Sequence, residues 1–266
     1  MTVPYDIAVF GMRRSGNHAI CAWLAGHFPD GVFYMGDVKR YGRLDPYLKG
    51  ESARLFANPL YGQEPWIQRE YNPGMTIIHT YEDYLPTQAE LRTYKPRGKH
   101  FQLYILRDPF NLFASRLKMA DKGFAGWPGT LIVPQWIQFA SRYEAVRDQC
   151  MVPTTGTPVA VLFNSWHVSN PARRYLEHDL GKLPESDQYF QHVVNTSGIG
   201  SSFDGVAFDG NATDMPVTQR WEQYAKDKRF RNLISNPNLM LHAEHLFPAL
   251  TRRVCSTLNL PKEVTG

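Results

Sequence analysis

Residues 11–18, which read Gly-Met-Arg-Arg-Ser-Gly-Asn-His, are the part of this sequence best suited to bind an anion. They lie between an apolar run, Ile7–Phe10, and a segment whose apolar residues recur at helical spacing. A strand that enters a helix through a G-x-x-x-x-G turn presents the unpaired N–H groups of the first helical turn to a ligand. Arg13 and Arg14 add positive charge to this turn. We therefore predict a phosphate-binding loop.

The residues after Gly16 distinguish this loop from that of a nucleoside triphosphatase. Such an enzyme would place Lys and then Ser or Thr there, to contact the phosphates and to hold magnesium. Here Asn17 and His18 follow. We expect the loop to bind phosphate without a metal ion.

A second arginine follows another apolar run. Residues 101–106 are predicted to form a strand, and Arg107, Asp108 and Pro109 come directly after it. Asp is a good helix cap and Pro suits the first helical turn, so a helix should start here. The guanidinium of arginine matches the geometry of phosphate oxygens. Two strand ends that carry arginine suggest a ligand with two separated phosphate groups.

The elements that must position these residues alternate along the chain. We predict strands at 7–10, 32–35, 75–78, 101–106 and 159–163, and helices after residue 17 and at 109–120, 134–150, 171–180, 217–234 and 239–258. This alternation indicates an α/β fold with a parallel β-sheet flanked by helices on both faces. Ligands of such folds bind at the carboxyl ends of the strands. We expect a single domain, 1–266, with a loop-rich aromatic insertion at about 39–74.

In their order, these motifs resemble those of the sulfotransferases that use 3′-phosphoadenosine 5′-phosphosulfate (PAPS). Residues 10–18 resemble the 5′-phosphosulfate loop of that family. Residues 104–109, with Ser115 eight positions after Arg107, resemble its 3′-phosphate site. Residues 77–83 resemble the segment that carries the family's catalytic Lys and His. The resemblance spans nearly the whole chain and implies a P-loop-like sulfotransferase fold.

The same resemblance implies which residues bind PAPS and its product, 3′-phosphoadenosine 5′-phosphate (PAP). Residues 201–204, Ser-Ser-Phe-Asp, resemble a loop that contacts the nucleotide, with the Phe against adenine. Arg220-Trp221 is the nearest counterpart of a late Arg-Lys-Gly segment. The implied donor-binding residues are Arg13, Arg14, Ser15, Gly16, Asn17, His18, Arg107, Ser115, Ser201, Ser202, Phe203 and Arg220.

The sequence departs from the family where the catalytic residues are expected. His79 stands where Lys is usual, and Tyr81 stands where the catalytic His is usual. Arg14, with His18 or His79, would stabilise the charge that develops on the leaving phosphate. The acceptor also needs a base that takes its proton. Candidates for this base are Glu82 first, then His79, then Asp37, another strand-end residue.

Two other functions compete with the sulfotransferase hypothesis. A nucleotide or small-molecule kinase would need magnesium, whereas a catalytically inactive nucleotide-binding module would bind without transfer. The formal net charge of the 266 residues is only +4, and no basic and aromatic stripe indicates nucleic-acid binding. Arg116 and Lys118 are expected on an ordinary solvated helix face.

Composition places the protein among ordinary globular proteins, with 43% hydrophobic and 20% charged residues. Its three cysteines are far apart, which favours a reducing compartment. No signal-peptide pattern is visible, and no apolar run approaches the roughly 20 residues of a membrane helix. We expect a cytoplasmic protein with a small-molecule or carbohydrate-containing acceptor; the acceptor's identity and the oligomeric state stay open.

Overall fold

The structure is a computed structural model that describes residues 4–28, 32–38, 41, 44, 53–56, 74–124, 129–149, 158–180, 190–191, 203–205 and 207–260. Its strands are β1 (Tyr5–Gly11), β2 (Val32–Met35), β3 (Ala53–Phe56), β4 (Ile77–Glu82), β5 (Lys99–Leu106) and β6 (Pro158–Leu162). Its α-helices are α1 (Asn17–Gly26), α3 (Gln88–Thr93), α4 (Pro109–Asp121), α5 (Ile132–Gln149), α6 (Phe163–Val168), α7 (Asn170–Asp179), α8 (Lys228–Ile234), α9 (Pro237–Leu246) and α10 (Pro248–Leu258). The 3-10 helices are η2 (Gly129–Leu131), η4 (Ala212–Asp214) and η5 (Arg220–Tyr224).

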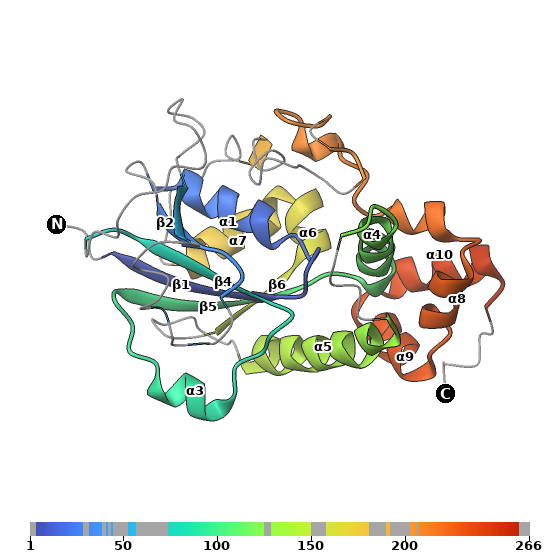
Figure 1. Cartoon of the computed structure of the whole chain (residues 1–266), viewed down its shortest axis with the longest axis horizontal. Coiled ribbons are helices and arrows are strands. Elements are labelled where there is room, and N and C mark those ends of the chain that lie inside the picture. Colours follow the sequence, from blue (N-terminus) through green and yellow to red (C-terminus); the bar gives the residue numbers. More distant parts are fainter. Residues whose placement is uncertain are drawn as a thin grey trace.

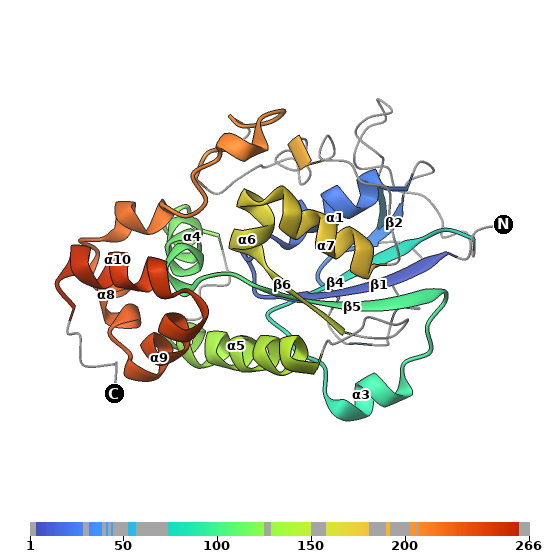
Figure 2. The ribbon, with the colours of Figure 1, turned by 180° about the vertical axis from the view of Figure 1, so that it is seen from behind.

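The six described strands form one sheet in the order β3-β2-β4-β1-β5-β6. Every neighbouring pair is parallel except β2 and β3, which are antiparallel. Helices α1, α6 and α7 cover one face, and α5 lies against the other (Figures 1 and 2). The predicted α/β fold, with a parallel sheet between two helical layers, is therefore confirmed.

Burial on both faces explains why β1 is a continuous apolar run rather than an alternating one. Ile7 and Val9 pack with α1, α6 and α7, whereas Ala8 and Phe10 pack on the opposite face with β2 and β4. The carboxyl ends of the parallel strands point toward α4, beyond which α8, α9 and α10 gather (Figure 1). This edge is where the sequence motifs meet.

Several predicted boundaries were wrong for identifiable reasons. The helix predicted at 217–234 is a turn followed by η5 and α8, because Asp227 caps a new helix at the N–H groups of Arg229 and Phe230. The helix predicted at 239–258 breaks before Pro248, which starts α10. The insertion at 39–74 contains strand β3, and α3, which we did not predict, begins with a capping box.

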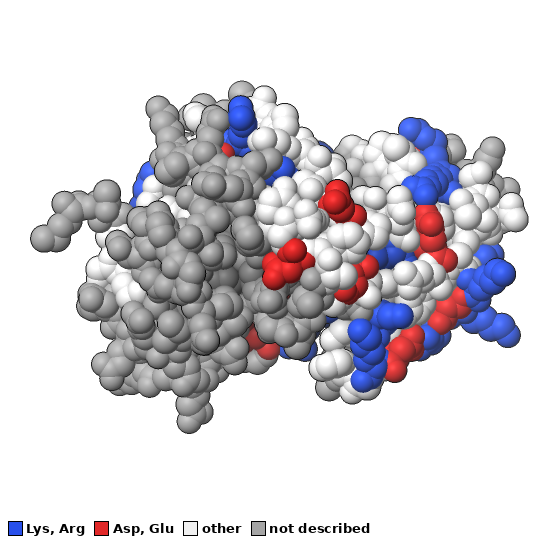
Figure 3. All heavy atoms as spheres, turned by 90° about the horizontal axis from the view of Figure 1, so that it is seen from above, with Lys and Arg blue, Asp and Glu red and all other residues white. Residues whose placement is uncertain are grey.

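Two further observations concern the length of the described helices and the charge of the described surface. None of the helices in these ranges is long and apolar enough to span a membrane. Acidic and basic side chains are interspersed on the coloured part of the face shown in Figure 3. The described surface there offers no broad basic stripe of the kind that nucleic acid requires.

Candidate functional site

Both glycines of the loop at 11–18 are required by its geometry. Gly16 caps α1 with φ of 92°, in the left-handed region that favours glycine. A Cβ atom on Gly16 would also lie 2.1 Å from the ring of Phe163. A Cβ atom on Gly11 would lie 2.1 Å from Oδ1 of Asn17. Two close contacts therefore require the two glycines. Gly16 approaches Phe163, the first residue of α6, and Gly11 approaches the side chain of Asn17.

Arg107 lies beneath this loop and is 2% exposed. Its Nη1 donates a hydrogen bond to the backbone oxygen of Arg14 (2.9 Å), and its Nη2 donates to the backbone oxygen of Val217 (2.9 Å). Nη1 also lies 3.5 Å from Oγ of Ser115, so the predicted pair is adjacent. The guanidinium stacks over the ring of Phe163, 5.0 Å from its centroid. Arg107 thus joins the loop after β1 to the helix after β5.

Arg14, Arg107 and Arg220 form a positively charged group, which we call the arginine cluster. Burial and the charge of Arg220 lower the pKa of Arg14 to about 10. Burial and the charges of Arg220 and Arg14 lower the pKa of Arg107 to about 9. Burial, followed by the charges of Arg107 and Arg220, lowers the pKa of the neighbouring His167 to about 3. A positive potential of this kind favours an anionic ligand.

Asp204 and the ring of Phe203 both lie beside Arg220 of the arginine cluster. Arg220 pairs with Oδ2 of Asp204 (3.0 Å), and its guanidinium lies 5.2 Å from the ring centroid of Phe203. Lys118 approaches the same ring at 5.6 Å. The predicted adenine-contacting residue is therefore next to the predicted donor-binding Arg220.

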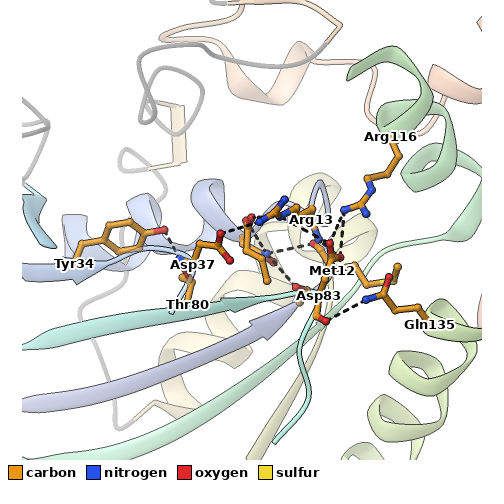
Figure 4. Close-up of polar contacts among 11 residues, drawn as sticks. Met12, Arg13, Tyr34, Asp37, Thr80, Asp83, Arg116 and Gln135 are labelled. Atoms are coloured by element: carbon orange, nitrogen blue, oxygen red, sulfur yellow. Dashed lines mark hydrogen bonds and ion pairs between the residues drawn. The ribbon is translucent and has the colours of Figure 1, made fainter. Parts of the chain in front are cut away.

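A second group of charged residues, which we call the carboxylate group, follows the ends of β2 and β4 (Figure 4). It contains Asp37, Glu82 and Asp83. Nη2 of Arg13 lies 2.7 Å from Oδ2 of Asp37, and its Nε lies 3.4 Å from Oε2 of Glu82. Arg13 and Arg14, although adjacent in sequence, thus take different partners: Arg13 contacts the carboxylate group and Arg14 belongs to the arginine cluster.

Asp83 ties the loop to α4 and α5. It accepts a hydrogen bond from the backbone N of Arg13 (2.9 Å) and contacts Nη1 of Arg116 through both oxygens, at 3.2 and 2.8 Å. Its backbone oxygen accepts from Nε2 of Gln135 (3.1 Å; Figure 4). Arg116 is 5% exposed, so its predicted place on a solvated face was wrong. Helical spacing alone could not identify a carboxylate partner 33 residues away.

Three residues at this edge have an unusual backbone conformation. Arg14, Asp37 and Asp83 have φ values of 71°, 50° and 57°, and they follow three neighbouring strands, β1, β2 and β4. Positive φ in residues other than glycine costs roughly 1–3 kcal/mol each and concentrates at functional sites. The strained positions here coincide with the two charged groups.

Of four further residues predicted to bind the donor, the structure describes two. The backbone N of Ser15, itself buried, donates to the oxygen of Met12 (3.0 Å) within the turn. His18 lies in the first turn of α1 beside the ring of Tyr34, with 6.2 Å between centroids. Ser201 and Ser202 lie outside the described residues.

The structure places His79 within strand β4 and not at its carboxyl end. Strand β4 extends to Glu82, four residues beyond the predicted strand end, so His79 lies inside the sheet with no exposed surface. Its Nε2 is 2.9 Å from Oδ1 of Asp6, and its Nδ1 is 2.8 Å from the hydroxyl of Tyr81. Burial lowers the pKa of His79. His79 is not brought together with the loop, and we leave it out of the candidate site.

The start of α4 keeps Arg107 in place. Asp108, which is fully buried, accepts hydrogen bonds from the backbone and side-chain nitrogens of Asn111, at 2.8 and 2.9 Å. Asn164 Nδ2 donates to its other oxygen (2.8 Å), and Nε1 of Trp136 donates to the oxygen of Arg107 (2.9 Å). The sequence predicted the cap, but it did not indicate that Asn164 and Trp136 contact this turn.

Comparison with known proteins gives limited information. The sequence matches no model of a known protein family and no curated protein. The chain is structurally similar to a sulfotransferase domain from the Synechococcus PCC 7002 olefin synthase, with a TM-score of 0.43 and 13% sequence identity. The match covers 85% of this chain and 97% of that chain. It is too distant to assign a function, which must be argued from the residues.

Proposed function

We propose that this chain is a PAPS-dependent sulfotransferase that moves a sulfuryl group to a hydroxyl or amine of an acceptor. The observation that carries the proposal is the arginine cluster at the carboxyl edge of the sheet. Arg14 and Arg107 follow neighbouring strands, and Arg220 comes from η5. The charges of three neighbouring guanidiniums repel one another; the pair of Arg220 with Asp204 offsets part of this repulsion, and a bound anion would offset more of it.

A donor with phosphate groups at both ends fits this cluster. The glycine loop and the first turn of α1, with Arg14, are suited to the 5′-phosphosulfate. Arg107 with Ser115 is suited to the 3′-phosphate, and Phe203 beside Arg220 is suited to the base. Ser201 and Ser202 complete the donor site in this proposal, as the sequence resemblance implies.

Transfer would proceed in line at sulfur. The acceptor oxygen forms a bond to sulfur while the bond from sulfur to the bridging oxygen of the 5′-phosphate breaks. Arg14 stabilises the negative charge that develops on the leaving phosphate. The carboxylate of Glu82 takes the proton of the acceptor. It releases this proton to water after PAP and the sulfate ester leave. Glu82 is suited to this role by its place at the end of β4, in register with Gly11 of the loop.

Metal is not needed in this mechanism, since arginine side chains meet the phosphate charge. Among the described residues, no group of three or more His, Cys, Asp or Glu side chains is arranged to hold a metal ion. A kinase activity would instead require magnesium. We propose a small-molecule acceptor, with carbohydrate hydroxyls as the first class to screen.

Calorimetry with PAP in the presence of EDTA tests the donor site. We expect micromolar binding by the wild type, with affinity reduced about 100-fold in Arg14→Ala and in Arg107→Ala, since each removes charge-assisted hydrogen bonds. Binding only with magnesium, or no binding, would contradict the proposal.

Transfer of labelled sulfate from PAPS to a panel of acceptors tests the chemistry. With an acceptor found, Glu82→Gln should lower kcat by about 100- to 10,000-fold, as loss of a general base does. The Kd of PAP should stay unchanged in this variant. PAP binding without transfer to any acceptor would favour an inactive nucleotide-binding module.

A further inference from the structure

The side chain of Asn17, predicted to bind the donor, faces the other way. Asn17 is the first residue of α1 and is 3% exposed. Its Nδ2 lies 3.4 Å from the backbone oxygen of Gly11, 3.3 Å from that of Met12 and 3.3 Å from Oε1 of Glu82. All three neighbours are acceptors, so the side-chain amide must present its NH₂ group to them. This fixes which way the amide points.

The contact is built into the sheet. Gly11 and Glu82 are the paired last residues of β1 and β4. The Asn17 amide spans the ends of these two strands, and its Oδ1 occupies the space where a Cβ of residue 11 would stand. Glycine is therefore the one residue type at position 11 that leaves room for the side-chain amide of Asn17. Arg13 contacts the other oxygen of Glu82, with Nε 3.4 Å from Oε2.

We propose that Asn17 is a positioning residue, which with Arg13 holds the carboxylate of Glu82 in place at the end of β4. The inference rests on the proposed function, in which Glu82 accepts the acceptor's proton. The Asn17 amide donates a hydrogen bond to the Glu82 carboxylate and restricts its rotation. The side chain of Asn17 therefore acts on the transfer step and not on donor affinity.

The test separates kcat from donor binding in Asn17→Ala. We expect kcat to fall about 10- to 100-fold, because a hydrogen bond to a charged group is lost. The Kd of PAP for Asn17→Ala should stay within about twofold of the wild-type value. For Arg107→Ala we expect the opposite pattern, a raised Kd of PAP with little change in kcat. In a Glu82→Gln background, Asn17→Ala should lower kcat by less than about twofold, because both changes act through one carboxylate.

Controls keep folding apart from positioning. Asn236→Ala removes an amide that caps α9, far from the loop, and reports the effect of a lost Asn hydrogen bond on stability alone. Circular dichroism and thermal unfolding establish that each variant is folded. If Asn17→Ala does not fold, Asn17→Ser replaces it under the same criteria.

Two results would overturn the inference. Asn17→Ala could weaken PAP binding as strongly as Arg107→Ala does, which would make Asn17 a donor ligand. Its effect on kcat could also multiply fully with that of Glu82→Gln, which would make the two residues independent. Failure of the wild type to bind PAP or to transfer sulfate would overturn the proposed function itself, and this inference with it.

Discussion

The two edges of the central sheet carry polar clusters of opposite character. At the amino end of β1, Asp6 is fully buried and its carboxylate is fully engaged. It accepts hydrogen bonds from Nε2 of His79 (2.9 Å), Nδ1 of His100 (3.2 Å), the hydroxyl of Tyr94 (2.9 and 2.8 Å) and the backbone N of Arg97 (2.8 Å). We call this group the Asp6 cluster. Hydrogen-bond donors from the protein itself therefore satisfy the Asp6 carboxylate.

At the carboxyl edge, charged residues of both signs gather instead, and three arginines lie together beside Asp204 and the carboxylate group. Arg107 packs against backbone oxygens and an aromatic ring, and its pKa is lowered by two other arginines as well as by burial. Strained residues surround this group, whereas none of the positive-φ residues recorded among the described ranges belongs to the Asp6 cluster. Burial of polar residues therefore does not by itself mark a site. Three arginines brought together next to strained backbone positions are the stronger indication of a site.

The first prediction tests whether the Asp6 cluster serves stability alone. Asp6→Asn should lower the free energy of unfolding by about 3 kcal/mol, because it breaks a buried charged network. Asp37→Asn, at the carboxyl edge, should cost less than about 1 kcal/mol, since that carboxylate and Arg13 are each about one-third exposed. Urea unfolding measures both. A loss of PAP affinity in folded Asp6→Asn would contradict the distinction between the two edges.

The second prediction concerns the positive charge of the arginine cluster. PAP at 100 times its Kd should stabilise the wild type by about 2.7 kcal/mol, as binding to the folded state alone requires. Arg220→Gln should lose most of this gain at the same PAP concentration. Unfolding curves with and without PAP provide the measurement. An equal gain in both proteins would show that Arg220 does not contact the ligand.

The third prediction compares two glycines that share a left-handed conformation. Gly16→Ala should cost about 2 kcal/mol or more, because its Cβ meets Phe163 in addition to the backbone strain. Gly123 has a φ of 79°, but no atom lies within 4 Å of the position a Cβ would take. Gly123→Ala should therefore lower the free energy of unfolding by only about 1 kcal/mol. The difference, measured by urea unfolding, isolates the contact with the ring. Equal costs would show that Phe163 moves aside freely.

The fourth prediction uses the pH dependence of stability. Burial alone would raise the pKa of Asp6, but hydrogen bonds from His100 and His79 lower it below its ordinary value of 3.8. The stability that Asp6 contributes is therefore present above about pH 4 and is lost as the pH falls further. The loss is at most about 1.4 kcal/mol per pH unit for this group. Urea unfolding between pH 2 and 6 should show the wild type approaching Asp6→Asn at the acid end; a constant difference would contradict the shift.

Much of the fold was predictable because its signals are local. The apolar run of β1, the glycines at 11 and 16, and the Asp108-Pro109 helix start depend on neighbouring residues only. The association of Arg107 with Ser115 was expected from the family resemblance and not from a local signal. The helix breaks at Asp227 and Pro248 carried signals that helical periodicity concealed.

The partners of charged residues were not predictable, because they depend on strand order and register. His79 contacts Asp6, 73 residues away, because β4 pairs with β1 and is longer than its apolar run. Arg116 contacts Asp83 because the turn after β4 lies beside α4. A pattern in one segment says which residue types are present there, but not which segment will lie opposite.

By itself, the sequence determined that a turn with two glycines and two arginines, but without the Lys-Ser/Thr pair of a nucleoside triphosphatase, precedes a helix, and that another arginine follows another strand. Local geometry fixes these features. Only the tertiary structure decided that Arg13 contacts carboxylates while Arg14 joins Arg107 and Arg220, and that Asn17 faces Glu82. Adjacent side chains leave a turn in different directions, and which groups they meet depends on strands brought together from distant parts of the chain.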